Sequence, residues 1–239
     1  MNVGALVKVA KHMGTLAIMK EIGYDFVLLD NEHGFYSFQE LHDLSMYAKS
    51  IQLNVIVRIS EISKTEICKT LDAGATGILV PMVEHAAQVA EIVQFAKYPP
   101  LGVRGYAGGA NTIYRKAITH QEAIAEANAT CKVYVQIETL TGVQHAAELA
   151  VQEYLDGIVI GPADLAISLG HPGDVMREEQ LAIMKNIADL CDDQSIEFGI
   201  IGKEAMIQQF QDQVQFAVSA IDTDILYQGL QKQRELWKK

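Results

Sequence analysis

Polar side chains directly follow short apolar runs at four places in the chain. One run ends at Asp30 and continues into Glu32 and His33, and another holds Arg58. Two further runs lead into Gln136 and Glu138, and into Gly161, Pro162, Ala163 and Asp164. Carboxylate, imidazole and guanidinium groups can hold a cation, move a proton and stabilise an anion. These residues are therefore the candidates for chemistry.

Glu138 and Asp164 form the candidate metal pair. They follow two apolar runs that are consecutive in the sequence, and neighbouring parallel strands lie about 4.8 Å apart, so the two carboxylates would converge. Two protein oxygens on octahedral Mg2+ or Mn2+ leave about four positions for water and a chelating substrate. A pair neutralised by a nearby Lys or Arg is one alternative, and a glycosidase-type acid/base pair is another.

Arg58 and His33 are the candidates for anion binding and proton transfer. Arg58 lies within an apolar run, where a guanidinium is costly unless it meets an anion. It can stabilise negative charge on a substrate oxygen, or form a structural ion pair with Asp30 or Glu32. His33 alone among the seven histidines follows such a run beside carboxylates, where imidazole can act as a base near neutral pH. A hydrogen-bonded loop role is the alternative for His33.

The segment 161–165 resembles the start of a helix, whose free N–H groups could hold a substrate carboxylate. Together with a metal, a guanidinium and a base, this segment suits a small keto acid. A metal chelated by the carboxylate and keto oxygen of such an acid would polarise the ketone and stabilise an enolate. The residues therefore indicate metal-assisted enolate chemistry.

Eight short apolar runs alternate with segments of helical period and must position these residues. The runs cover residues 4–9, 25–30, 54–59, 76–81, 132–138, 157–161, 197–201 and 215–221. Nearly continuous apolar runs indicate parallel strands covered on both faces. Eight units in 239 residues predict one (β/α)8 barrel domain over residues 1–239, with the polar strand ends at its mouth. An open doubly wound sheet is the runner-up, but it normally carries a glycine-rich fingerprint after its first strand, which is absent here.

One connection is long for its place in such a barrel. Residues 98–115 are rich in Gly, Pro and Tyr, and helix becomes plausible only from about Ile118. Long irregular segments are usually lids, binding loops or subunit contacts. A passive surface excursion is the alternative.

The composition narrows the classes of partner. Thirty acidic residues against 19 basic ones give a formal charge of -11, which argues against nucleic acid and anionic membranes as partners. No apolar stretch approaches the length of about 20 residues that spans a bilayer, and residues 1–8 do not read as a signal peptide. Cys68, Cys131 and Cys191 are typical of reduced core thiols. We expect a cytoplasmic protein.

At these residues the sequence resembles the HpcH/HpaI aldolase family. These are class II, pyruvate-specific aldolases that include 2-keto-3-deoxy sugar acid and 4-hydroxy-2-oxo-heptanedioate aldolases. The similar segments span nearly the whole chain: residues 23–34 (GYDFVLLDNEHG), 57–58 (VR), 71–75 (LDAGA), 79–82 (LVPM), 98–105 (YPPLGVRG), 135–139 (VQIET) and 160–165 (IGPADL).

The resemblance implies a (β/α)8 barrel, often a hexamer built as a trimer of dimers that swaps its last helix. It implies reversible cleavage of a 4-hydroxy-2-keto acid into pyruvate and an aldehyde with Mg2+, Mn2+ or Co2+. The roles it implies are metal ligands for Glu138 and Asp164, general base for His33, enolate stabiliser for Arg58, a carboxylate raising the basicity of His33 for Asp72, and substrate contacts for Gln136, Ala163 and Asp164. Asp30 is the alternative partner of His33, because Asp72 falls near the end of an expected helix.

Two departures and three other functions qualify this reading. Ala110 and Asn111 follow Gly109 where many relatives carry an Arg-Ala pair, which predicts a different aldehyde or a different subunit contact, and the segment before the first strand is short. A citrate-forming condensation of oxaloacetate with an acetyl donor, or cleavage of a CoA thioester, could use the same metal and Arg58. A catalytically silent barrel that binds a keto acid is the third alternative.

Overall fold

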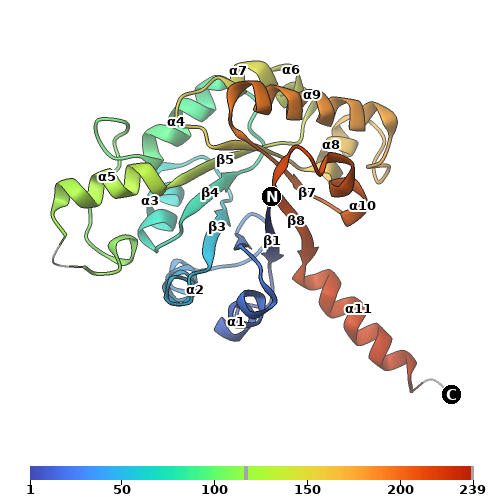
Figure 1. Ribbon diagram of the computed structural model, residues 1–239, viewed down its shortest axis with the longest axis horizontal. Helices are drawn as coiled ribbons and strands as arrows, with labels where there is room; N and C mark the ends of the chain where they lie inside the picture. Colours follow the sequence, from blue (N-terminus) through green and yellow to red (C-terminus); the bar gives the residue numbers. More distant parts are fainter. Residues whose placement is uncertain (116–117, 238–239) are drawn as a thin grey trace.

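The computed structural model describes residues 1–115 and 118–237, and it contains a closed barrel of eight parallel strands in sequence order (Figure 1). The strands are β1 (Asn2–Val7), β2 (Phe26–Asp30), β3 (Asn54–Arg58), β4 (Gly77–Val80), β5 (Lys132–Ile137), β6 (Gly157–Ile160), β7 (Glu197–Ile201) and β8 (Val214–Ile221). Each predicted strand overlaps one of these. The predicted (β/α)8 barrel is confirmed, and the doubly wound sheet is wrong because β1 pairs with β8 and closes the sheet.

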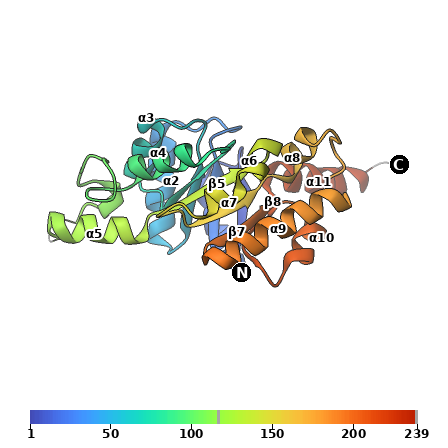
Figure 2. The same cartoon turned by 90° about the horizontal axis from the view of Figure 1, so that it is seen from above.

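Helices flank the barrel between the strands (Figure 2). They are α1 (Met13–Ile22), α2 (Phe38–Ser50), α3 (Lys64–Asp72), α4 (Ala86–Ala96), α5 (His120–Thr130), α6 (Leu140–Gln144), α7 (Ala146–Ala150), α8 (Pro162–Ser168), α9 (Glu178–Gln194), α10 (Glu204–Ile207) and α11 (Asp222–Glu235), with 3-10 turns at Ala110–Thr112 and Gln208–Phe210. None of the described helices is long and apolar enough to cross a membrane.

The barrel interior is filled by side chains. Phe26 and Phe216 pack with ring centroids 4.4 Å apart, and Tyr134 packs on Phe216 at 5.0 Å. A second and larger apolar layer joins the outer faces of the strands to the helices. Because the interior is packed, functional side chains must lie at the two ends of the barrel or on its outside.

Local capping signals set the loop that carries His33. Ser37 Oγ accepts a hydrogen bond from the Glu40 amide at 3.2 Å, and Glu40 Oε2 accepts one from the Ser37 amide at 2.7 Å. This capping box fixes the first turn of α2. The chain therefore has only a short turn between Asp30, the last residue of β2, and α2.

The long connection lies beside α2 and α3. Lys49 Nζ donates to the carbonyl oxygen of Ala110 at 3.0 Å, and Arg104 Nη2 pairs with Asp72 Oδ1 at 2.6 Å. Asp72 is the last residue of α3, which runs back from the carboxyl end of β3 to the start of β4. These contacts lie at the amino-terminal ends of the strands, away from the barrel mouth.

The last helix leaves the barrel instead of covering it. Figures 1 and 2 both show α11 running outward on the side of the molecule opposite α5. Its first residue is anchored, because Asp222 Oδ2 accepts hydrogen bonds from the amides of Lys8, Val9 and Ala10 at 2.7–3.0 Å. Ile225, Leu226, Tyr227 and Leu230 on this helix are exposed.

Candidate active site

The carboxyl ends of the strands bring the predicted site residues to one mouth. Asp30 and Arg58 end β2 and β3 and are partners in the strand register. Gln136 lies in β5, and Glu138 directly follows that strand. Asp164 lies in the first turn of α8, which starts just after β6. Barrel closure therefore assembles residues that are far apart in the sequence.

Arg58 is held in place by Asp30. Its Nε donates to Asp30 Oδ1 at 2.9 Å and its Nη2 to Asp30 Oδ2 at 2.8 Å. Asp30 is 0% exposed and Arg58 5%. Burial alone would raise the pKa of Asp30, but the hydrogen bonds and charge of Arg58 outweigh it and lower this pKa. The ion pair that the sequence left as an alternative for Arg58 is thus present, and Asp30 is a fixed negative charge.

The remaining amino group of Arg58 faces other site residues. Arg58 Nη1 lies 3.1 Å from Glu32 Oε2 and donates to Gln136 Oε1 at 3.4 Å. The Glu32 contact is an ion pair without the geometry of a hydrogen bond. Burial raises the pKa of Glu32, and the charges of Arg58 and His33 oppose this. One donor edge of Arg58 is thus turned toward the mouth while the other is locked on Asp30.

Glu138 is a buried carboxylate with two neutral donors. It is 2% exposed, its Oε1 accepts from the Met82 amide at 2.9 Å, and its Oε2 accepts from the Gln136 side-chain amide. Burial raises the pKa of Glu138 to about 7, and the nearby charges of Glu32 and Asp164 add to this increase. A hydrogen-bonded path therefore joins Asp30, Arg58, Gln136 and Glu138.

The backbone at Gly161 passes close to this path. A Cβ at this position would lie 2.5 Å from Glu138 Oε2 and would also meet the Gln136 amide. The residue has a φ of −97°, which any amino acid can adopt, so the need for glycine is one of space. Gly161 therefore leaves room beside the Glu138 carboxylate.

His33 lies exposed at the mouth, with its Nε2 3.7 Å from Glu32 Oε2. Asp72, the partner of His33 that the family resemblance implies, forms no ion pair with His33 among the described residues of the single chain. Asp72 pairs with Arg104 at the other end of α3, because that helix carries its last residue away from the mouth. Asp30 contacts only the backbone of His33, whose amide donates to Asp30 Oδ1 at 3.3 Å.

The donors at the mouth fit a hard divalent cation. The charges of Glu32 and Asp164 both raise the pKa of Glu138, and Arg58 is already paired with Asp30, so a cation would offset an excess of negative charge. Within residues 1–115 and 118–237, no three His, Cys, Asp or Glu side chains are grouped as a complete metal cage. Two carboxylate ligands leave several coordination positions of a divalent cation open, as expected where a substrate completes the coordination.

Glu32 stands between Arg58 and His33 and forms the ion pair with Arg58 that the sequence left open as an alternative. Two features of the site were missed in the sequence. The Met82 amide that holds Glu138 belongs to a residue with a φ of 55°, for which the sequence offers no signal. The space at Gly161 depends on how closely β5 and β6 approach.

Ala163 is exposed at the start of α8, as a backbone contact to substrate requires.

A packed (β/α)8 barrel with an acidic, arginine-bearing mouth has the layout of barrel enzymes. The family model for HpcH/HpaI aldolase/citrate lyase matches residues 9–226, and the chain belongs to this family of carbon–carbon lyases.

Two curated relatives have the same name. The chain is 37% identical over 171 residues to a hydroxypyruvate/pyruvate aldolase of Delftia acidovorans, covering 71% of this chain and 63% of that protein. It is 34% identical over 230 residues to a hydroxypyruvate/pyruvate aldolase of Roseobacter denitrificans, covering 94% and 88%. The Delftia match thus spans less than two thirds of that relative.

Two solved structures have the same fold. The HpcH/HpaI aldolase from Desulfitobacterium hafniense superimposes with a TM-score of 0.95 at 26% identity, over 100% of this chain and 93% of the other. The citrate synthase SbnG superimposes with a TM-score of 0.87 at 28% identity, over 98% and 92%. The names of these two structural neighbours therefore refer to two different reactions.

Proposed function

We propose that this chain is a class II aldolase that reversibly cleaves a 4-hydroxy-2-keto acid into pyruvate and an aldehyde. The observation that carries the proposal is the path from Asp30 through Arg58 and Gln136 to Glu138 at the barrel mouth, with Asp164 beside it. The names of the curated relatives support pyruvate as one product.

In this proposal Glu138 and Asp164 hold Mg2+, Mn2+ or Co2+. When bound, the cation polarises the keto oxygen and offsets negative charge that develops there. Burial and two nearby carboxylates raise the pKa of Glu138 and so disfavour its charged form. A bound divalent cation would favour the charged form. The Met82 amide and the Gln136 side chain orient the Glu138 carboxylate.

His33 transfers the proton of the 4-hydroxyl group, and Arg58 stabilises the negative charge that forms on the substrate oxygen. In cleavage, His33 takes the proton from the 4-hydroxyl group, the C3–C4 bond breaks, the aldehyde leaves and the bond electrons form the pyruvate enolate. The protonated His33 then returns this proton to C3 of the enolate, which gives pyruvate and restores the neutral imidazole. Arg58 Nη1, which is held at the mouth by the Asp30 pair, donates to the oxygen that becomes negative. Gln136 and the Ala163 backbone position the keto acid.

Proton exchange of the pyruvate methyl group in D2O, followed by NMR, tests the proposal. The protein is stripped of metal and then given Mg2+, Mn2+ or Co2+. We expect exchange only with added metal, and we expect His33→Ala to slow it by about 100-fold or more. Exchange without metal contradicts the metal assignment, and no exchange with any metal contradicts the aldolase.

A citrate-forming condensation is the second candidate, because the SbnG citrate synthase shares the fold over nearly the whole chain. This reaction would use the same charged mouth with oxaloacetate and an acetyl donor. Citrate formation from oxaloacetate and acetyl-CoA, without pyruvate methyl exchange, would favour it. Calorimetric binding of pyruvate without any turnover would instead indicate a non-catalytic binding barrel.

We also propose that the chain forms a homo-oligomer through α11. The exposed apolar residues of this outward helix, together with Leu236 and Trp237, which are 71% and 81% exposed, favour coverage by a second copy. A hexamer assembled as a trimer of dimers is the arrangement that the family resemblance suggests. The cytoplasmic location expected from composition stays a prediction.

A further inference from the structure

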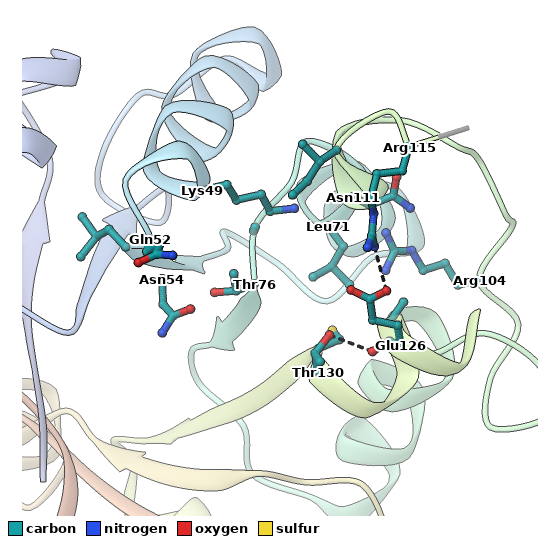
Figure 3. A pocket seen from close by; sticks show the side chains of 15 residues that line it. Lys49, Gln52, Asn54, Leu71, Thr76, Arg104, Asn111, Arg115, Glu126 and Thr130 are labelled. Carbon is teal, nitrogen blue, oxygen red and sulfur yellow. Dashed lines mark hydrogen bonds and ion pairs between the residues drawn. The ribbon is translucent and has the colours of Figure 1, made fainter. Parts of the chain in front are cut away.

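A cavity of about 410 Å3 lies on the outside of the barrel, away from the mouth (Figure 3). Its wall is built from the end of α2, the end of α3, the start of β3 and β4, helix α5 and the long connection. The polar residues that matter here are Lys49, Arg104, Arg115, Glu126, Asn111 and Thr76. None of them belongs to the proposed active site.

Three cationic side chains from different segments converge on this cavity. Figure 3 shows Lys49 pointing from α2 toward the region where Arg104, Arg115 and Asn111 meet. Burial, followed by the charges of Arg104 and Arg115, lowers the pKa of Lys49. The only acceptor recorded for the Lys49 ammonium within the described chain is the carbonyl oxygen of Ala110 at 3.0 Å. Lys49 therefore forms no ion pair with a described carboxylate, and Glu126, the negative charge that acts on it, is itself paired with Arg115.

Arg104 lines the cavity and carries one buried donor without a described partner. It is 4% exposed, its Nη2 pairs with Asp72 at 2.6 Å, and its guanidinium lies 4.7 Å from the centroid of the Tyr98 ring. Its Nε is buried and has no hydrogen-bond partner among the described residues. A buried donor without an acceptor costs stability, so an oxygen at this place would be favourable.

The third cation is anchored but accessible. Arg115 Nη2 pairs with Glu126 Oε2 at 2.7 Å and its Nε donates to the Thr112 carbonyl oxygen at 3.1 Å, while its side chain stays 46% exposed. Asp72 and Glu126 offset two of the three positive charges. Among these five described side chains one net positive charge remains, in a protein whose formal charge is -11.

We propose that this outer cavity binds a phosphate group, as inorganic phosphate or as a phosphate monoester. Donors that approach from Lys49, Arg104 and Arg115 suit a tetrahedral oxyanion, whose free oxygens point in different directions. Leu53, Leu71 and Ile113 provide apolar wall for the carbon part of an ester. The site is independent of the aldolase proposal, because it lies at the opposite end of the strands from Glu138 and Asp164.

Titration calorimetry and thermal unfolding of the full chain test this site. The protein is stripped of divalent metal so that phosphate cannot bind through a cation at the mouth, and ionic strength is kept constant. Inorganic phosphate and glycerol 3-phosphate are the probes. We expect one binding event per chain and a raised unfolding midpoint with at least one probe. Tighter binding of glycerol 3-phosphate identifies an ester as the ligand, and equal or weaker binding identifies inorganic phosphate.

Variants localise the binding. Lys49→Gln and Arg115→Gln should each weaken it by about tenfold or more, because each removes a charge-assisted contact. Lys185→Gln, which removes an exposed cation on α9, should leave the affinity unchanged. No binding of either probe, or full affinity in both cavity variants, overturns the proposal. Pyruvate methyl exchange is not a readout here, so the result does not depend on the proposed reaction.

Discussion

At the level of single residues, the pair of Asp30 and Arg58 explains how a guanidinium can stand in an apolar strand. Two hydrogen bonds and a full opposite charge offset the desolvation of both groups. The pair therefore has two effects. It keeps Arg58 charged and oriented at the mouth, and it makes the barrel depend on Arg58 for stability.

Arg58→Met should destabilise the protein by about 3–5 kcal/mol at pH 7, because it leaves the buried Asp30 charge without its main partner. In the native protein the pKa of Asp30 is lowered, so the pair contributes stability above the ordinary pKa of Asp, about 3.9, and loses it as pH falls through the lowered native pKa. In the variant, burial should raise this pKa.

Urea unfolding at pH 7 and pH 5 measures this effect. The difference between wild type and Arg58→Met should be smaller at pH 5, because protonation of Asp30 relieves, in the variant alone, a buried charge whose remaining ion-pair partner is Lys8 at 3.4 Å. Arg177→Met, which breaks an exposed pair with Glu179, serves as control and should change stability by less than about 1 kcal/mol. An equal Arg58→Met penalty at both pH values would argue against an ionised Asp30 as its source.

Glu138→Gln and Asp164→Asn should each weaken Mn2+ binding by about 100-fold or more, because each removes one anionic oxygen ligand while preserving side-chain shape. Calorimetry with the metal alone measures this without any substrate. Glu148→Gln on α7 removes an exposed carboxylate and should leave the affinity unchanged. Unaltered Mn2+ affinity in both mouth variants would refute the ligand assignment.

At the level of elements, the junction between β6 and α8 sets the space at the mouth. Gly161 ends the strand region, and Pro162 starts the helix, where its missing amide costs nothing. The absence of a side chain at Gly161 lets this junction approach Gln136 and Glu138 on the neighbouring strand.

Gly161→Ala should lower the rate of pyruvate methyl exchange by about 100-fold. The added methyl group would lie too close to the side chains of Glu138 and Gln136, so both must move out of their positions at the mouth. Circular dichroism should still report a folded barrel, since the backbone angle suits alanine. Gly105→Ala is the matched control, because a Cβ there meets nothing within 4 Å. A fully active Gly161→Ala would show that the mouth tolerates the shift.

At the level of the whole molecule, α11 is the surface through which we propose that the chain assembles. The helices that follow the earlier strands pack on the barrel, but α11, which follows β8, extends outward (Figure 1). Its residues Ile225, Leu226, Tyr227 and Leu230 are exposed. Exposure of these side chains on one short helix is unfavourable in water. The isolated chain is therefore expected to associate.

The double variant Leu226→Glu and Leu230→Glu should shift the protein toward monomer, because burying two carboxylates in an apolar contact is costly. Light scattering coupled to size exclusion measures the mass of the wild type and of the variant. Gln231→Glu adds one such carboxylate at an exposed polar position of α11 and should not change the mass. A wild-type monomer, or a double variant that stays assembled, would exclude α11 as the contact.

The positions of the strands and the residues at their ends were determined by the sequence alone. Buried parallel strands require nearly continuous apolar runs, and a polar residue such as Asp30 or Glu138 marks where burial ends. The alternation of runs and helical segments then placed the polar ends at one mouth, because all strands of a barrel point the same way.

The partners of these residues were decided only by the tertiary structure. Asp30 meets Arg58 because β2 and β3 pair in that register, and Asp72 meets Arg104 because α3 ends at the far side of the barrel. A register slip of one residue would turn each side chain to the other face. Contacts between distant segments, including those that build the outer cavity, follow from register and closure, which no local pattern encodes.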